Sequence, residues 1–339
     1  MKLNPEFATY LAPDLKICRI LNGMWQVSGA HGYIDKRKAI NSMGLYVDNG
    51  FTTWDLADHY GPAEDLVKNF RELRIKEKKE DSLKDLKFFT KWVPRPQTIT
   101  RQLVRNAIDI SRKRMGMQSL DMLQFHWWDY QDNNYLKAID FLDELRQEGI
   151  LSYLGLTNFD TKHVEEFLKM GIDIVSNQVQ YSLIDRRPEE LMEAVCKKYN
   201  IKLLAYGTLC GGLLSERFLG KPEPLGDQLN TASLFKYKNM IDQWGDWKLF
   251  QELLETLHKI ALKYNVSIAN VAVRYVLKNP IVGGAIIGVR LGISEHISQN
   301  SKIFNFSLNQ GDIEEIHNIL SKSNNLIQVI GDCGDEYRR

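Results

Sequence analysis

The sequence of 339 residues predicts an α/β protein that folds as a single (β/α)8 TIM barrel. Short β-branched or aromatic runs alternate with amphipathic segments of helical period, which is typical of βαβ units around a parallel sheet. Eight such units follow one another from Lys16 onward, and polar residues recur where the strand segments end. In barrels of this kind, functional side chains stand at the carboxyl ends of the strands.

Eight segments, each too short for a stable helix, are the predicted strands. In chain order they are Ile17–Leu21, Phe51–Trp54, Lys87–Thr90, Met122–Phe125, Tyr153–Leu156, Ile174–Asn177, Lys202–Ala205 and Ala285–Ile287. Helix boundaries are predicted from N-cap residues and from glycines that follow a helix, namely Asp35, Asp160, Ser267, Gly116, Gly149 and Gly171. We expect one domain over 1–339, with a barrel core at about 16–305 and a C-terminal helix and tail at about 309–339.

Two stretches do not fit the repeat. The charged run from Glu72 to Lys84 is predicted to extend a helix or a surface loop, with a solvated face and no function. The segment from Gly207 to Gly245 shows little periodicity and follows the seventh strand. A loop of this length at the active end of a barrel usually has a function.

Composition excludes several classes of partner. Lys and Arg number 44 and Asp and Glu 43, and no long basic block is present, so nucleic acid is not an expected partner. No run of 18 apolar residues predicts a membrane span, and the first twenty residues lack an apolar signal segment, so we expect a soluble, cytoplasmic protein. The four cysteines are far apart, which predicts reduced, structural thiols and no metal site: Cys18, Cys196, Cys210 and Cys333.

The polar residues at the strand ends form one set. They are Asp55, Lys91, His126, Thr157, Asn158, Gln178 and Tyr206, with Tyr60 five residues beyond Asp55. Any one of them could be structural, for example as a buried ion pair or a satisfied core histidine. Structural demand does not predict such residues at one end of six strands, because each would need a buried partner. Together they predict a functional site.

The same residues carry a resemblance to the aldo-keto reductase family over roughly residues 16–305. Asp55-Leu-Ala-Asp-His-Tyr60-Gly61 resembles the family motif Asp-x-Ala-x-x-Tyr-Gly. Further matches are Phe89-Thr-Lys91, Leu123-Gln-Phe-His126-Trp127, Leu154-Gly-Leu-Thr-Asn158, Asn177-Gln178-Val-Gln-Tyr181 and Ala205-Tyr206. Six motifs in the right order make a chance match improbable.

The resemblance implies an NAD(P)H-dependent oxidoreductase that reduces aldehydes or ketones, with Asp55, Tyr60, Lys91 and His126 as its catalytic tetrad. A hydride delivered to a carbonyl carbon leaves an alkoxide, which a positioned acid must protonate. Tyr60 can be that acid, and Lys91 is expected to lower its pKa while Asp55 holds Lys91 charged. His126 would donate a hydrogen bond to the carbonyl or relay the proton. No metal is required.

The remaining residues imply a cofactor seat. Thr157, Asn158 and Gln178 can hydrogen-bond a nicotinamide carboxamide, and Tyr206 can stack on its ring. By resemblance, the loop at about 207–245, with Gly207 and Leu209, covers the pyrophosphate, and Gly288, Arg290, Gln299 and Asn300 meet the adenosine end. Arg290 favours NADPH, with NADH as the alternative. Two extra residues after Arg290, and His296 in place of an arginine, depart from the common pattern.

Trp25, Trp92 and Trp127 stand beside tetrad elements and are predicted to line an apolar pocket for a small-molecule carbonyl substrate. Two other functions remain open at this point. Some relatives of the family are regulatory channel subunits that bind a dinucleotide with little turnover. Alternatively, a strand-end lysine such as Lys91 can form a Schiff base in an aldolase-type barrel. The substrate, the direction of the reaction and the oligomeric state also stay open.

Overall fold

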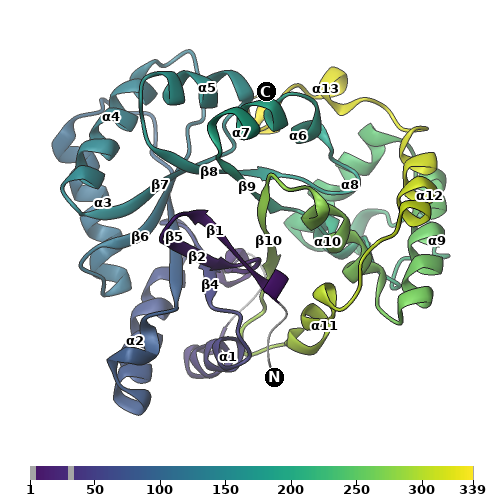
Figure 1. The fold of residues 1–339 in the computed structure, drawn as a ribbon, viewed down its shortest axis with the longest axis horizontal. Helices are drawn as coiled ribbons and strands as arrows, with labels where there is room; N and C mark the ends of the chain where they lie inside the picture. Colours follow the sequence, from purple (N-terminus) through teal and green to yellow (C-terminus); the bar gives the residue numbers. More distant parts are fainter. Residues whose placement is uncertain (1–4, 30–33, 339) are drawn as a thin grey trace.

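The structure is a computed structural model that describes residues 5–29 and 34–338. Its centre is a closed barrel of eight parallel strands in the order β10-β3-β4-β5-β6-β7-β8-β9 (Figure 1). The strands are β3 (Ile20–Gly23), β4 (Thr53–Asp55), β5 (Lys87–Trp92), β6 (Leu120–Phe125), β7 (Leu151–Thr157), β8 (Ile174–Gln180), β9 (Lys202–Tyr206) and β10 (Val282–Gly288). The prediction of a (β/α)8 barrel is confirmed, and seven predicted strands overlap the observed ones.

The predicted strand Ile17–Leu21 is wrong as a single element. The chain bends at Arg19, whose guanidinium donates to the carbonyl oxygens of Leu277 (2.8 Å) and Val282 (3.1 Å). Before the bend, β2 (Leu15–Cys18) pairs antiparallel with β1 (Ala8–Ala12). This hairpin lies across the end of the barrel where the strands begin (Figure 1), and its apolar residues form one cluster with the barrel interior: Leu11, Leu15, Ile17, Leu21, Phe89, Met122, Val175 and Leu204. The opposite end is left for the site.

Helices surround the barrel. They are α1 (Lys36–Asp48), α2 (Ala63–Lys78), α3 (Arg101–Met115), α4 (Asn134–Gln147), α5 (Thr161–Lys169), α6 (Arg187–Glu190), α7 (Met192–Tyr199), α9 (Trp247–Tyr264) and α10 (Ile268–Lys278). The predicted N-caps are confirmed, since Asp35, Asp160 and Ser267 each accept a hydrogen bond from a backbone N–H of the first turn. Gly116, Gly149 and Gly171 have positive φ at helix ends, as predicted. The charged run Glu72–Lys84 continues α2 and ends in a 3-10 turn.

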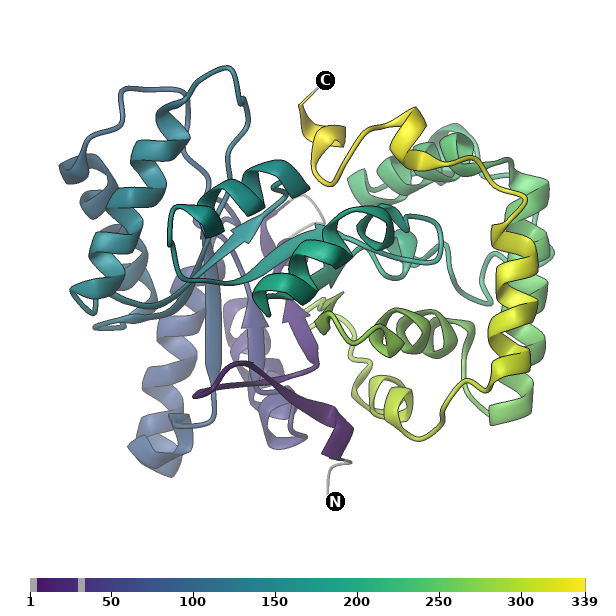
Figure 2. The ribbon, with the colours of Figure 1, turned by 45° about the horizontal axis from the view of Figure 1, so that its top comes forward.

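The segment 207–245 is not one irregular loop. It contains α8 (Ala232–Trp244), which begins at the N-cap Thr231. Sequence periodicity missed this helix because its buried residues include the polar Lys238 and the amphipathic Tyr237 and Trp244. After β10 the chain forms α11 (Ile297–Ser301), α12 (Gln310–Leu320) and α13 (Leu326–Val329). Figure 2 shows the C-terminal segment leaving α12 beside α9 and returning across the barrel towards α5.

The four cysteines are buried and unpaired, which confirms that they pack as structural thiols. Within residues 5–29 and 34–338, every helix is too short or too polar to cross a membrane.

Candidate active site

A buried ion pair lies at the carboxyl ends of β4 and β5. The ammonium of Lys91 donates to both carboxylate oxygens of Asp55, at 2.8 and 2.7 Å, and to the carbonyl oxygen of Leu56 at 2.9 Å. Asp55 and Lys91 are each 3% exposed. Because an ammonium has three protons, all of its donors are used. Burial lowers the pKa of Lys91, as a Schiff-base lysine would require, but the Asp55 carboxylate opposes this shift, and a bound carboxylate partner argues against the aldolase-type alternative.

Two glutamine amides also bind Asp55. Gln124 in β6 and Gln178 in β8 each donate from Nε2 to Asp55 Oδ1, at 2.8 and 2.7 Å, and Gln178 Nε2 lies 2.6 Å from Gln124 Oε1. Gln178 was expected to bind a cofactor amide, but both of its N–H groups are engaged inside the barrel. Only its carbonyl oxygen is left for a ligand. Gln124 was missed from sequence, although a glutamine at an inward-facing strand position is a usable signal.

Tyr60 lies in the loop after β4, and its ring is half-buried. The ring packs edge-on against Trp25, with centroids 5.0 Å apart, and the Lys91 ammonium is 5.2 Å from its centroid. Burial raises the pKa of Tyr60 well above 10, and the negative charge of Asp55 raises it further. The pKa of Tyr60 is therefore raised and not lowered as expected, because burial and the Asp55 carboxylate act on it, while the Lys91 ammonium is charged but paired with Asp55. Tyr60 keeps its proton at neutral pH, as a general acid must.

His126 follows β6 and is 2% exposed. Its Nδ1 lies 3.0 Å from the carbonyl oxygen of Thr157, and since a carbonyl only accepts, Nδ1 carries the proton. Burial lowers the pKa of His126 from 6.5 to about 4, so the ring is neutral at pH 7. Nε2 is then an unprotonated acceptor, and it is buried without a hydrogen-bond partner among the described residues. The expected donation from His126 to a carbonyl does not fit this geometry.

The lowered pKa predicts a pH-dependent loss of stability. Below pH 6.5 the unfolded chain takes up a proton at His126 that the folded chain resists until about pH 4, so the wild type loses stability over this window. At pH 4 the loss from this group should be about 3 kcal/mol, at about 1.4 kcal/mol for each unit of pKa shift. Urea unfolding of His126→Asn between pH 7 and pH 4 should show a correspondingly smaller loss. His296→Asn, at an exposed site, should follow the wild type, and equal losses in all three proteins would contradict the burial argument.

The residues predicted to hold nicotinamide lie together beyond the strand ends. Thr157 Oγ1 is buried and has no partner among the described residues. Asn158 has φ +57°, a left-handed conformation that asparagine tolerates, and its Oδ1 accepts from the Tyr206 hydroxyl at 2.9 Å. The Lys236 ammonium of α8 lies 5.1 Å from the Tyr206 ring centroid. The Tyr206 ring, the Thr157 hydroxyl and the Lys236 ammonium therefore lie at the same corner of the barrel.

The residues predicted for the rest of a dinucleotide lie after β9 and β10. Gly207 has φ +72°, and a Cβ there would be 2.4 Å from the Tyr237 hydroxyl, so the loop passes close over α8. Gly288 ends β10 and Arg290 follows it with an exposed side chain. Leu209 is half-buried, Gln299 is exposed in α11 and Asn300 is buried beside it. Gly207, Leu209, Gly288 and Arg290 directly follow or end their strands, whereas Gln299 and Asn300 belong to α11.

Of the three predicted pocket tryptophans, only Trp25 contacts the tetrad. Trp92 stacks on Phe125, with centroids 5.6 Å apart, and Trp127 packs against the same ring. Both are about 5% exposed or less and belong to the core. Side chains alternate along a strand, so with Lys91 inside the barrel Trp92 must point outward. The tryptophan whose ring packs against the His126 ring is Trp128. The two ring centroids are 4.3 Å apart, and Trp128 is 43% exposed.

The C-terminal tail, residues 331–338, reaches the same corner, which the sequence does not predict. Tyr337 lies 3.1 Å from the Tyr206 hydroxyl, and its ring faces His126 and Trp128. Glu336 Oε1 lies 3.3 Å from the Tyr206 hydroxyl. The tail sequence, with two glycines and a charged run that ends in Tyr and Arg, signals an irregular segment but not its destination.

Comparison with known proteins identifies the family and the fold. The model of the aldo/keto reductase family matches residues 19–321. Aldo-keto reductase YhdN of Bacillus subtilis is 26% identical over 332 residues, with 94% of each chain covered. The NADH-specific methylglyoxal reductase of Escherichia coli is 25% identical, with 88% of this chain and 93% of the relative covered. The solved structure of glycerol dehydrogenase AKR11B4 from Gluconobacter oxydans has the same fold, with a TM-score of 0.76 at 21% identity over 97% of this chain and 98% of that one.

The strand-end geometry and the family match together show that this chain belongs to the aldo/keto reductase family, whose members are oxidoreductases that act on small carbonyl compounds with nicotinamide cofactors.

Proposed function

We propose that the protein is an NADPH-dependent reductase that converts aldehydes or ketones to alcohols, with Tyr60 as the general acid. The observation that carries the proposal is the position of Tyr60, whose ring lies 5.2 Å from the Lys91 ammonium of the buried Asp55–Lys91 pair. The unpartnered Nε2 of His126 belongs to the same set of strand ends. Such a set combines a proton donor with fixed charges and needs no metal.

A bound nicotinamide supplies the hydride, and the chain supplies the proton and the electrostatic field. Tyr60 gives its hydroxyl proton to the carbonyl oxygen as negative charge develops there. The phenolate that remains is stabilised by the Lys91 ammonium, which Asp55 keeps charged and fixed. His126, neutral and with Nδ1–H directed to Thr157, presents an unprotonated Nε2 that can accept a hydrogen bond from the alcohol product or from a hydroxyl group of the substrate.

The residues fit a nicotinamide dinucleotide. Thr157 Oγ1 is a buried polar atom that lacks a partner among the described residues, as expected for a group that binds a ligand amide. Asn158 and the Gln178 oxygen would complete that contact, and Tyr206 would stack on the ring. The loop with Gly207 and Leu209 would cover the pyrophosphate, and Gly288, Arg290, Gln299 and Asn300 would hold the adenosine end.

The exposed Arg290 guanidinium supports NADPH over NADH, because a charge-assisted contact to a 2′-phosphate is available only to NADPH. The family does not decide this preference, since one relative is named as NADH-specific. We also infer a cytoplasmic location, because the four cysteines are free.

The proposal is tested by cofactor oxidation with a panel of aldehydes, sugars and quinones. Wild-type protein should oxidise NADPH with at least one member of the panel and should prefer it to NADH. Arg290→Ala should weaken NADPH binding by roughly tenfold, the value of one charge-assisted hydrogen bond, and leave NADH binding within about twofold. Equal losses for both dinucleotides, or a wild-type preference for NADH, would contradict the assignment of NADPH. A lack of carbonyl reduction with both cofactors would contradict the function.

A further inference from the structure

The C-terminal tail, residues 331–338, is held against the cofactor seat by one buried arginine at the start of α6. We propose that Arg187 is a positioning residue: through Glu336 of the tail it fixes the Tyr206 hydroxyl and Asn158, and so sets the geometry in which the nicotinamide ring is bound. The proposal rests on the proposed function, because it takes Tyr206 and Asn158 as the nicotinamide seat.

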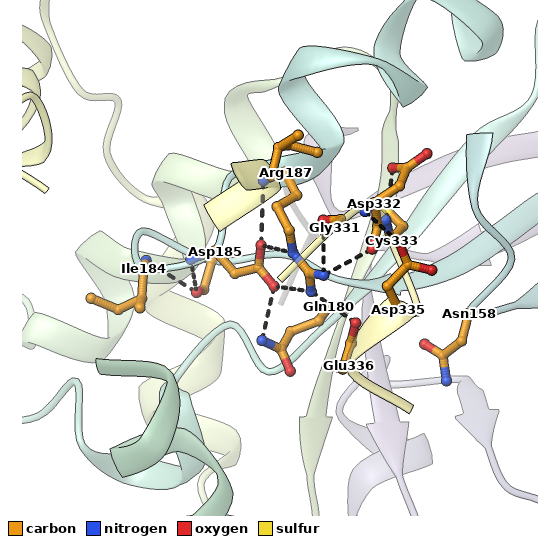
Figure 3. Close-up of polar contacts among 12 residues, drawn as sticks. Asn158, Gln180, Ile184, Asp185, Arg187, Gly331, Asp332, Cys333, Asp335 and Glu336 are labelled. Atoms are coloured by element: carbon orange, nitrogen blue, oxygen red, sulfur yellow. Dashed lines mark hydrogen bonds and ion pairs between the residues drawn. The ribbon is translucent and has the colours of Figure 1, made fainter. Parts of the chain in front are cut away.

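All three nitrogen atoms of the Arg187 guanidinium donate hydrogen bonds. Nε donates to Asp185 Oδ1 at 2.9 Å and Nη2 to Asp185 Oδ2 at 2.7 Å, which is a two-point contact with one carboxylate. Nη2 also donates to Glu336 Oε2 at 3.0 Å, and Nη1 donates to the carbonyl oxygen of Asp332 at 2.9 Å. Figure 3 shows the guanidinium between Asp185 on one side and the tail residues on the other. Arg187 therefore joins α6 to a segment about 150 residues away in sequence.

The three charged side chains Arg187, Asp185 and Glu336 are almost fully shielded from water. The side chains of Arg187 and Asp185 are 1% and 0% exposed, and that of Glu336 is 9% exposed. Burial would lower the pKa of Arg187, but Asp185 and Glu336 outweigh it and raise that pKa. Burial likewise opposes ionisation of Glu336, yet Arg187 and Lys236 bring its pKa below the usual value. Arg187 and Glu336 therefore stay charged at neutral pH, and a charge-assisted contact that is shielded from water holds its geometry tightly.

The second carboxylate oxygen of Glu336, Oε1, contacts the nicotinamide seat at Tyr206. Glu336 Oε1 lies 3.3 Å from the Tyr206 hydroxyl, which in turn lies 2.9 Å from Asn158 Oδ1. The single proton of the Tyr206 hydroxyl is shared between these two acceptors, so a change in Glu336 alters the contact between Tyr206 and Asn158. The next tail residue also contacts Tyr206, since the Tyr337 hydroxyl lies 3.1 Å from that of Tyr206.

The backbone of the tail fits closely against Asn158. Arg338 donates to the carbonyl oxygen of Asn158 at 2.7 Å, and a Cβ at Gly334 would lie 2.0 Å from the same oxygen. Gly334 also has φ +86°, which glycine alone adopts without strain. The tail therefore contacts the main chain of Asn158 directly and reaches its side chain only through the Tyr206 hydroxyl. A structural anchor for the tail alone would not need these contacts.

The test measures NADPH dissociation constants by protein fluorescence, together with kcat and cofactor KM, on full-length protein. Arg187→Lys keeps the charge but loses the fork, and Glu336→Gln keeps the shape but loses the charge. Each should raise the NADPH Kd by roughly tenfold, as expected for one charge-assisted hydrogen bond, with cofactor KM rising more than kcat falls. The double variant should be no worse than about twice the weaker-binding single variant, because both changes break one linkage. In a Tyr206→Phe background, Glu336→Gln should change Kd by less than about twofold.

The neighbouring Arg186 provides the matched control. Arg186 precedes α6 and contacts Glu189 at 3.7 Å and Tyr275, away from the tail, so Arg186→Lys should leave Kd within about twofold of the wild type. Glu336→Gln lies in the tail outside the barrel, so it tests the proposal even if Arg187→Lys fails to fold. A lowered Tm with unchanged Kd in both variants, or additive effects in the double variant, would overturn the proposal. Tighter NADPH binding by Glu336→Gln would also overturn it, since the tail would then compete with the cofactor.

These outcomes are distinct from a failure of the proposed function. If wild-type protein binds neither NADPH nor NADH, both proposals fail. If it binds and turns over but the variants match it, only the role of Arg187 fails.

Discussion

Tyr60→Phe should lower kcat by roughly 10²–10⁴-fold while the NADPH Kd changes by less than about threefold. The change removes one hydroxyl and leaves the ring, which packs edge-on against Trp25 at 5.0 Å. The Asp55–Lys91 pair does not depend on that hydroxyl, so the barrel and the cofactor seat persist. Burial and Asp55 hold the pKa of Tyr60 well above 10, so the proton that is lost is one that the wild type carries at neutral pH.

The measurement is steady-state carbonyl reduction together with cofactor binding by fluorescence. Tyr10→Phe is the matched control, because Tyr10 is 54% exposed on β1 at the other end of the barrel, and it should keep wild-type kcat. Near wild-type turnover by Tyr60→Phe would remove Tyr60 as the donor. His126 would then have to act in its doubly protonated form, since its neutral ring directs Nδ1–H to Thr157. The same pair of measurements separates an enzyme from a regulatory cofactor-binding protein, in which binding would be retained and turnover low in the wild type.

The strands and most of the strand-end set could be predicted because both depend on local sequence. Asp55 and Lys91 follow buried strand segments, and neighbouring parallel strands bring them together at one end of the barrel. The hairpin β1–β2 was missed, although Pro13 and Asp14 are a typical turn pair between two short β-forming runs. Because this turn was not recognised, the predicted strand Ile17–Leu21 joins the end of β2 to the start of β3.

The tail and the electrostatics could not be predicted locally. Arg187 and Glu336 are 149 residues apart, and nothing in either segment specifies the other. The expected lowering of the Tyr60 pKa by Lys91 does not include burial or the nearby Asp55 carboxylate, which both raise that pKa. Proximity in sequence to Lys91 and His126 predicts Trp92 and Trp127 in the pocket, whereas packing on Phe125 puts both in the core.

Lys91→Met should abolish turnover and also destabilise the fold, by about 3–5 kcal/mol, because it leaves the Asp55 carboxylate buried without a counter-charge. The Gln124 and Gln178 amides still donate to Asp55, but they carry no net charge. Adding Asp55→Asn removes the uncompensated charge, so the double variant should regain most of the lost free energy of unfolding. It should stay inactive, since the phenolate of Tyr60 would have no ammonium beside it.

Urea unfolding at pH 7 measures the stability, and carbonyl reduction measures the activity of the same samples. Lys84→Met, at an exposed position just before β5, should match the wild type in both. If Lys91→Met alone kept wild-type stability, the two glutamines would be sufficient to hold a buried carboxylate. If the double variant regained both stability and turnover, the Lys91 ammonium would have no part in proton transfer, and its contact with Asp55 would be structural only.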